Sequence, residues 1–226
     1  SPSIGNLSFL IFLNLSDNSF GGNIPQEVGS LYRLEYLGMY SNDLIGKIPT
    51  SLFNCSSLLM IDLYSNHLGG GVPSELGSLT KLVNLYLGQN KLRGKLPTTL
   101  GNLTSMKEFD VGENNMEGRV PDDIARLTQL VYLELSTNNF FGGFPSSIYN
   151  LSSLMFLNIF TNGFSGSLRH DFGNLLPNLQ ELSMGSNYFT GSIPKTLPNI
   201  STIQMLAMEF NSLTGSVPLS FGKVRN

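Results

Sequence analysis

An asparagine recurs along the chain at a nearly constant spacing. Every interval is 24 residues except one of 25, and the positions are Asn18, Asn42, Asn66, Asn90, Asn114, Asn138, Asn162, Asn187 and Asn211. Each asparagine ends the pattern LxxLxxLxLxxN, and a proline stands seven residues after all of them except Asn162, where Arg169 takes its place. A period of this length is typical of stacked repeats, so residues 1–226 are expected to form one array of about nine repeats.

The LxL pair at the centre of each repeat alternates apolar and polar residues, as a short strand with one buried face does. A strand of three or four residues buries too little apolar surface to fold alone. Copies stacked edge to edge form a parallel sheet over a continuous leucine core. The asparagine follows the strand in a turn, where its amide can both donate to and accept from backbone groups that lack sheet partners.

These patterns predict the position of each strand. We expect nine short parallel strands that begin near Leu13, Leu37, Ile61, Leu85, Phe109, Leu133, Leu157, Leu182 and Leu206, with every repeated asparagine buried. The recurring proline favours extended chain on the convex side. The chain starts and ends within a repeat and has no polar cap, so we expect an uncapped excerpt of a longer array that aggregates or melts early when isolated.

Composition excludes several classes of function. Charged residues are 13% of the chain, the net charge is −3, and no run of Lys or Arg occurs, so nucleic acid is not an expected partner. No apolar run reaches the ~20 residues that span a bilayer. Cys55 is the only cysteine and is expected to be a small buried apolar residue. His67 and His170 have no second ligand or nucleophile at a suitable spacing, so no catalytic residue, metal or cofactor is expected.

The frame LxxLxxLxLxxNxLxGxIPxxLGNLxx resembles the plant-specific class of leucine-rich repeats along the entire chain. Narrower matches are SNHLGGGVPSELGSLTKL, GGFPSSIYNLSSL, DFGNLLPNLQEL and GSIPKTLPNISTI. They resemble the ectodomains of plant leucine-rich-repeat receptor kinases that include the receptor for bacterial elongation factor Tu and its close paralogues. The 25-residue repeat, with Leu168, Arg169 and His170 in place of the usual Ile-Pro, fits the same group.

The resemblance implies the fold and the cellular setting. It implies an α/β leucine-rich-repeat solenoid, which is a curved horseshoe with a parallel β-sheet on its concave face and little regular helix. It further implies a glycoprotein of plant innate immunity on the extracellular side of the plasma membrane. The membrane-spanning segment and the Ser/Thr kinase of such a receptor would lie outside this stretch.

Residues between and beside the strand leucines face the concave, solvent side of such a sheet. Aromatic residues form two groups among them, the first being Tyr36, Tyr40, Tyr64 and Tyr86 and the second Tyr132, Phe156 and Phe160. A contiguous band of exposed aromatic residues is typical of a binding surface. The alternative is that the rings only pack against one another as cross-strand pairs.

Three carboxylates lie between the aromatic groups, at Glu108, Asp110 and Glu134. Asp110 and Glu134 are equivalent positions on adjacent strands, where like charges destabilise a sheet by up to about 1 kcal/mol. A cationic partner would relieve that repulsion, and the alternative is a solvated acidic face in which the carboxylates repel weakly. A glycosidase-like pair is not expected, because a flat sheet offers no enclosed cleft to raise one pKa.

The chain contains six Asn-x-Ser/Thr acceptor sites for N-glycosylation, at Asn6, Asn14, Asn54, Asn102, Asn150 and Asn199. All except Asn14 fall just before the first leucine position of a repeat, off the concave strand. A glycan there would not block a ligand. Asn14 is expected on the concave face itself.

These features together predict a non-catalytic module that binds a peptide or protein ligand on its concave face. An extended peptide crossing nine strands at ~4.8 Å would need about 13 residues, and the resemblance points to a basic bacterial peptide and to a co-receptor kinase ectodomain as a second partner. The alternative is a secreted inhibitor of a pathogen cell-wall-degrading enzyme, similar to the polygalacturonase-inhibiting proteins. The aromatic band argues against a purely structural role.

Overall fold

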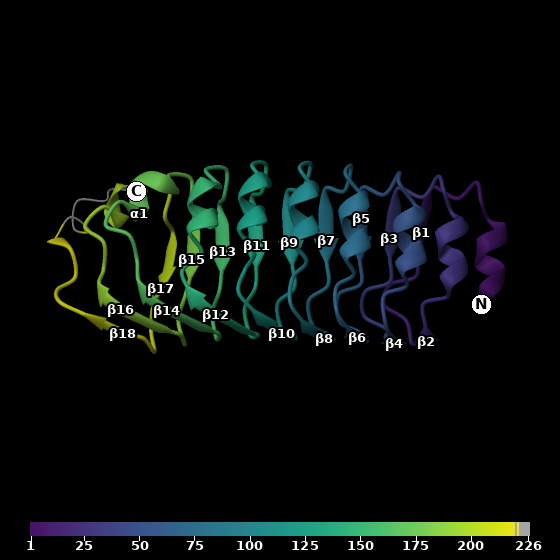
Figure 1. The fold of residues 1–226 in the computed structure, drawn as a ribbon, viewed down its shortest axis with the longest axis horizontal. Coiled ribbons are helices and arrows are strands. Elements are labelled where there is room, and N and C mark those ends of the chain that lie inside the picture. The colour runs from purple at the N-terminus through teal and green to yellow at the C-terminus, as the bar shows by residue number, and fades with distance from the viewer. Residues whose placement is uncertain (220, 222–226) are drawn as a thin grey trace.

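The repeats stack side by side into one elongated, gently curved array. The structure is a computed structural model that describes residues 1–219 and 221. Within each repeat the chain passes from a first sheet to a second sheet and then through a short helix on the opposite side (Figure 1). This arrangement confirms the leucine-rich-repeat solenoid predicted from the sequence.

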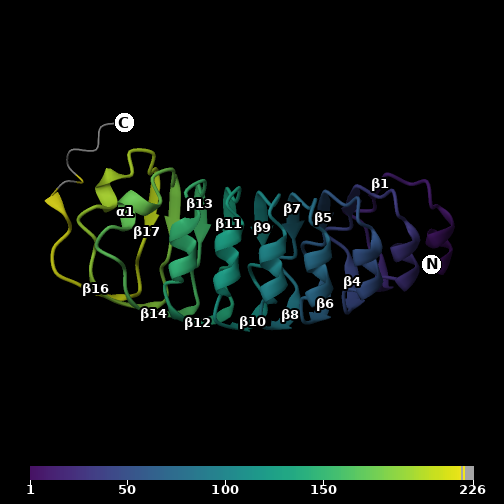
Figure 2. The ribbon, with the colours of Figure 1, turned by 45° about the horizontal axis from the view of Figure 1, so that its top comes forward.

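The first sheet has nine parallel strands of three residues, one from each repeat in chain order. They are β1 (Phe12–Asn14), β3 (Tyr36–Gly38), β5 (Met60–Asp62), β7 (Asn84–Tyr86), β9 (Glu108–Asp110), β11 (Tyr132–Glu134), β13 (Phe156–Asn158), β15 (Glu181–Ser183) and β17 (Met205–Ala207). The predicted leucine positions are the central residues of these strands, as Leu133 is in β11, buried between half-buried neighbours. The row of strands follows the hollow side of the arch in Figure 2.

A second nine-stranded parallel sheet, where only extended chain was expected, runs along the lower edge in Figure 1. Its strands are β2 (Gly21–Asn23), β4 (Asp43–Gly46), β6 (His67–Gly70), β8 (Lys91–Gly94), β10 (Asn115–Gly118), β12 (Asn139–Gly143), β14 (Gly163–Ser167), β16 (Tyr188–Ser192) and β18 (Ser212–Thr214). Each strand except β2 carries one inward apolar residue, and a recurring glycine follows two residues later. The backbone of that glycine is in the left-handed region, with φ +81° at Gly94, and glycine adopts this conformation without strain.

Short 3-10 helices form the opposite, convex side of the repeats. They are η1 (Pro2–Asn6), η2 (Gln26–Ser30), η3 (Thr50–Asn54), η4 (Ser74–Ser78), η5 (Thr98–Asn102), η6 (Asp122–Arg126), η7 (Ser146–Asn150) and η8 (Leu197–Asn199), and α1 (Phe172–Leu175) is the α-helix of the described residues. Pro73 stands before η4 with extended angles of φ −66 and ψ 143. Proline suits that position because it has a fixed φ and no N–H to pair.

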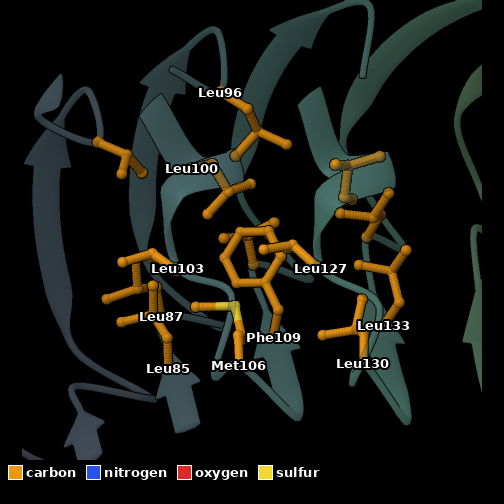
Figure 3. Close-up of a cluster of buried hydrophobic side chains, with 14 of the residues drawn as sticks. Leu85, Leu87, Leu96, Leu100, Leu103, Met106, Phe109, Leu127, Leu130 and Leu133 are labelled. Atoms are coloured by element: carbon orange, nitrogen blue, oxygen red, sulfur yellow. The ribbon is translucent and has the colours of Figure 1, made fainter. Parts of the chain in front are cut away.

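The core is a continuous stack of leucines between the two sheets and the helices (Figure 3). Phe109, Met106 and Leu103 are fully buried there. Cys55 lies in the same core as a buried free thiol, as predicted from the sequence. The expectation that the chain is an uncapped excerpt stays a prediction.

The repeated asparagines tie neighbouring repeats together. Asn90 donates its Nδ2 protons to the carbonyl oxygens of Leu63, Leu87 and Gly88 at 2.9, 3.2 and 3.0 Å. Its Oδ1 accepts from the N–H of Leu68 at 2.9 Å. The donors and acceptors of this amide therefore join its own repeat to the one before it.

The prediction that every such asparagine is buried is wrong at three positions. Asn18 is exposed, because no described repeat precedes it, and it donates only to Leu15 and Ser16 of its own repeat. Asn162 and Asn211 are half-buried. Asn162 is followed by Gly163, which brings no side chain to cover it, and Asn211 lies in the last repeat.

The 25-residue repeat replaces the usual proline turn by an aromatic cluster. The guanidinium of Arg169 lies over the ring of the buried Tyr149, 5.3 Å from its centroid, and binds Asp171 through two hydrogen bonds of 2.9 and 2.7 Å. Phe172 packs edge-on against Tyr149 and Phe144 at 5.7 and 5.5 Å. These contacts occupy the space that the added residue opens, so the sheets continue without a break.

Candidate ligand-binding face

The first sheet presents three columns of side chains on its concave face. The first column, at strand position one, is Phe12, Tyr36, Met60, Asn84, Glu108, Tyr132, Phe156, Glu181 and Met205. The second column, at strand position three, is Asn14, Gly38, Asp62, Tyr86, Asp110, Glu134, Asn158, Ser183 and Ala207. The third column, two residues further, is Ser16, Tyr40, Tyr64, Gly88, Gly112, Ser136, Phe160, Gly185 and Glu209.

Some of the aromatic residues pack against one another across strands. Phe12 and Tyr36 stack with ring centroids 4.2 Å apart, and Tyr132 and Phe156 are tilted at 6.1 Å. These pairs match the alternative interpretation of the aromatic band, so packing alone accounts for Tyr36 and Phe156. Tyr40 is also engaged, since its hydroxyl donates to Asp17 at 2.5 Å.

Tyr86 forms a separate small network with its neighbours in the first column. Its hydroxyl donates to the carboxylate of Glu108 and accepts from Asn84 Nδ2 at 2.8 Å. Burial, followed by the bond to Glu108, raises the pKa of Tyr86 to about 12. Tyr86 and Glu108 therefore satisfy each other and lie outside the hollow described next.

Four of the ten predicted ligand-binding residues meet in one hollow of about 170 Å³ near the middle of the concave face. They are Tyr64, Asp110, Tyr132 and Glu134. Its wall is completed by Gly112 and by three further polar residues, Glu113, Ser136 and Asn158. Tyr36, Tyr40, Tyr86, Glu108, Phe156 and Phe160 do not line it.

Asp110 and Glu134 each accept a hydrogen bond from the backbone two residues further along. Asp110 Oδ1 accepts from the N–H of Gly112 at 2.8 Å, and Glu134 Oε1 accepts from the N–H of Ser136 at 2.7 Å. Glu134 Oε2 also accepts from Asn158 Nδ2 at 2.8 Å. These bonds close local turns at the strand ends, which accounts for part of the preference for acidic residues there.

Burial dominates the electrostatics of the hollow. Asp110 is only 7% exposed, and the loss of solvent raises its pKa to about 7, with the negative charges of Glu134 and Glu113 acting in the same direction. Burial also raises the pKa of Glu134 and of the phenol of Tyr132. The alternative of a solvated acidic face does not hold for Asp110, which is buried. A flat sheet was expected to offer no enclosed cleft that raises a carboxyl pKa, but neighbouring side chains enclose this group.

Two glycines of the third column make room for this arrangement. A Cβ built on Gly88 would lie 2.8 Å from the ring of Tyr64 and 2.7 Å from Asp110 Oδ1. A Cβ on Gly112 would lie 3.0 Å from Glu134. Glu113, Asn158 and these glycines were not among the predicted ligand-binding residues. The signal that could have found Asn158 is its position, since it pairs with Glu134 on the adjacent strand.

The acceptor asparagines for glycosylation lie where they were expected. Asn6, Asn54, Asn102, Asn150 and Asn199 are the last residues of η1, η3, η5, η7 and η8, on the convex side. Asn14 is the last residue of β1 on the concave face, and its Oδ1 accepts from the N–H of Ser16 at 3.0 Å. Which of them carry glycans stays a prediction.

Comparison with known proteins places the repeats in a family. Residues 1–118 match the family described as leucine-rich repeat region, and residues 129–151 and 178–200 match single leucine-rich repeats. The chain belongs to the leucine-rich-repeat family. In the described part of this leucine-rich-repeat chain, no helix is long and apolar enough to cross a membrane and no cluster of three or more His, Cys, Asp or Glu could hold a metal ion.

Several of the similar solved structures are plant receptors. The plant peptide hormone receptor RGFR1 in complex with RGF2 is 32% identical with a TM-score of 0.95, over 99% of this chain and 36% of that one. The PEPR1–AtPEP1 complex is 33% identical with a TM-score of 0.92, over 96% of this chain and 31% of that one. This leucine-rich-repeat chain thus spans about a third of each.

A curated relative carries the narrower resemblance. The LRR receptor-like serine/threonine-protein kinase EFR of Arabidopsis thaliana is 76% identical over 33 residues, which is 15% of this chain and 3% of that protein. The similarity to plant leucine-rich-repeat receptor kinase ectodomains, expected from the sequence, is therefore confirmed. This leucine-rich-repeat chain corresponds to the ectodomain part of such receptors.

Proposed function

We propose that this chain recognises an extended peptide on its concave face, as the extracellular part of a plant immune receptor kinase, and that the hollow holds a basic residue of that peptide. The observation that supports this most strongly is the buried position of Asp110 beside Glu134. Two carboxylates on paired strand positions are costly when both are charged. A Lys or Arg side chain between them would favour the charged form of both.

The walls of the hollow suit the stem of such a side chain. The rings of Tyr64 and Tyr132 flank the carboxylates, and an aromatic ring can pack against an aliphatic stem and attract a nearby cation. Apolar residues of the peptide would then lie along the remaining concave aromatics. RGFR1 and PEPR1, which are similar to this chain over nearly its whole length, are known in complex with RGF2 and AtPEP1.

The proposal extends to the setting of the receptor. The resemblance to EFR supports a place on the extracellular side of the plasma membrane, with a co-receptor kinase ectodomain as second partner. The bacterial origin of the peptide belongs to the same proposal and rests on the same resemblance.

The test is a binding screen of the complete ectodomain against synthetic 13-residue peptides, about the length that crosses the sheet, with and without a central Arg. We expect binding that requires the Arg and is lost in the double variant Asp110→Asn, Glu134→Gln. Both amides keep the acceptor oxygen for the turn, so folding is preserved. The matched control is Glu27→Gln with Glu75→Gln in η2 and η4 on the convex side. Equal binding by both double variants would contradict the proposal.

A further inference from the structure

The outer face of the second sheet gathers basic residues from repeats that are distant in the sequence. Lys91 and Arg93 point outward from β8 on either side of the buried Leu92, and Lys95 follows β8 directly. Arg119 occupies the position of Lys95 in the next repeat, and Lys47 occupies it two repeats earlier. All five cations are exposed, and they are five of the 13 Lys and Arg residues of the chain.

Three of these side chains lie flat across the glycine of the following repeat. A Cβ built on Gly70 would meet Lys47 Cγ at 2.9 Å, and one on Gly118 would meet Lys95 Cγ at 2.8 Å. Arg119 lies across Gly142 in the same way, at 3.4 Å from Cγ and 3.5 Å from Nε. The aliphatic parts of these side chains thus pack on exposed glycine backbone, which restricts the positions of the charged groups. A partner that binds these groups loses less side-chain entropy than it would on freely moving lysines.

No ion pair of the described residues involves these five cations. The ion pairs there are Asp43 with His67 at 3.7 Å and Arg169 with Asp171 at 2.7 Å. Two carboxylates lie close to the group. Glu117 follows Asn115, which pairs with Arg93, so it stands beside Lys95, and Asp122 lines a hollow with Arg119. The five cations outnumber these two carboxylates. The face is therefore basic although the whole chain has a net charge of −3, and it attracts an anionic partner.

An exposed aromatic ring lies at one end of the basic row. Phe141 in β12 is 51% exposed and lines a shallow hollow of about 280 Å³ together with Arg119, Gly143, Pro145 and Asp122. A guanidinium beside an exposed phenyl ring offers one contact for a carboxylate and one for an apolar surface. The face of a sugar ring that carries C–H groups is such a surface. Exposed Asn115 and Asn139 on the neighbouring strands add donors and acceptors suited to hydroxyl groups.

We propose that the outer face of the second sheet, from Lys47 to Phe141, binds a linear anionic polysaccharide that carries a carboxylate on each sugar ring. Lys47, Lys95 and Arg119 follow directly on β4, β8 and β10, which are three strand intervals of ~4.8 Å apart, and a polymer with repeated carboxylates can contact them together with Lys91 and Arg93. Sugar rings can approach the exposed glycine backbone closely, and one sugar ring can stack on the phenyl ring of Phe141. This face lies on the other sheet from the concave hollow, so the two ligands would not compete.

The test uses the complete ectodomain and a fluorescently labelled oligogalacturonate. We expect binding that weakens as salt is raised and that falls at least about tenfold in the variant Lys91→Gln, Arg93→Gln, Lys95→Gln, Arg119→Gln. The matched control removes the same charge elsewhere, by Arg33→Gln, Lys81→Gln, Lys107→Gln and Arg126→Gln. It should bind within about twofold of the parent. Equal binding by both variants, or none by the parent, would overturn the proposal.

A second variant separates a sugar polymer from any polyanion. Phe141→Ala keeps every charge, so it should weaken oligogalacturonate several-fold and leave polyglutamate unaffected. The side chain of Phe141 is 51% exposed, so its removal should leave the melting temperature unchanged. If polyglutamate binds the parent as tightly as oligogalacturonate does, or if Phe141→Ala changes neither, the assignment to a polysaccharide is wrong.

Discussion

Asp110 and Glu134 are paired positions on the adjacent parallel strands β9 and β11. Each carboxylate accepts a hydrogen bond from an N–H of its own turn, at 2.8 and 2.7 Å, yet neither has a cationic partner among the described residues. The fold thus holds two like charges together in a hollow that excludes water from Asp110. A site of this kind is more stable when a proton or a ligand cation reduces the repulsion.

The first prediction concerns the pH dependence of stability. Burial raises the pKa of Asp110 from 3.8 to about 7, so between those values the folded chain binds more protons than the unfolded chain. The free energy of unfolding should then fall as pH rises from about 4 to about 7, by at most about 4 kcal/mol from this group. Asp110→Asn should reduce that slope. Urea unfolding of the complete ectodomain at a series of pH values measures it.

A control for this prediction has the opposite sign. The guanidinium of Arg169 holds the pKa of Asp171 below its usual range, so that contribution is present above the ordinary pKa and is lost as pH falls. Asp171→Asn should change only the acid end of the curve. A slope between pH 4 and 7 that is the same in the parent and in Asp110→Asn would show that the carboxyl is not buried as described.

The second prediction concerns the glycine beneath Tyr64. In Gly88→Ala the new methyl group would lie 2.8 Å from the Tyr64 ring and 2.7 Å from Asp110, so both must move. We expect loss of binding to the Arg-containing peptide with a fall in stability of about 1–3 kcal/mol. Gly77→Ala in η4 is the matched control, since its methyl group would meet Thr99 at 2.6 Å on the convex side. A similar loss of binding in both variants would point to a general distortion of the sheet.

The strands of the first sheet could be predicted from the sequence because the LxL pair gives two buried side chains at strand spacing. The second sheet could not, because its strands have at most a single inward residue, such as Leu68 between His67 and Gly69. A glycine directly after the inward residue indicates a turn and not a strand. Only the stacking of neighbouring repeats supplies the hydrogen bonds that make this segment a strand.

The site was predictable in part for a similar reason. The constant period placed Asp110 and Glu134 at paired positions, and the structure agrees. The period does not determine which way a side chain leans, so the bond from Tyr86 to Glu108 was not foreseen. The basic face was also missed, because its cations come from separate repeats, as Lys95 after β8 and Arg119 after β10 do.

The third prediction concerns the asparagine ladder. Asn90→Ala removes the donors to three carbonyl oxygens and the acceptor for the N–H of Leu68. All are buried, so the free energy of unfolding should fall by about 1–3 kcal/mol. Asn18→Ala should cost less, because Asn18 is exposed and water can replace its bonds. Urea unfolding of the two variants side by side gives the comparison, and equal losses would argue against burial as the cause.

The fourth prediction concerns glycosylation. We expect glycans at Asn54 and Asn150, which are exposed ends of convex 3-10 helices. Removing both sites by Ser56→Ala and Ser152→Ala should leave peptide binding unchanged, because the concave face is on the other side. Mass spectrometry of the secreted ectodomain gives the occupancy. A loss of binding with preserved secretion would place the ligand on the convex side.

The last prediction separates the two kinds of contact in the concave hollow. The carboxylates of Asp110 and Glu134 should steer a basic peptide, so its association rate constant should fall with rising salt, and less steeply in Asp110→Asn, Glu134→Gln. Tyr64→Ala should instead raise the dissociation rate constant and weaken affinity by about 1–2 kcal/mol, because the ring anchors the bound peptide. Tyr188→Ala is the matched control, since that tyrosine is 68% exposed on the second sheet. Surface plasmon resonance at low and high ionic strength measures both rate constants. If neither rate constant of a peptide changes with salt or in the variants of the hollow, that peptide binds elsewhere.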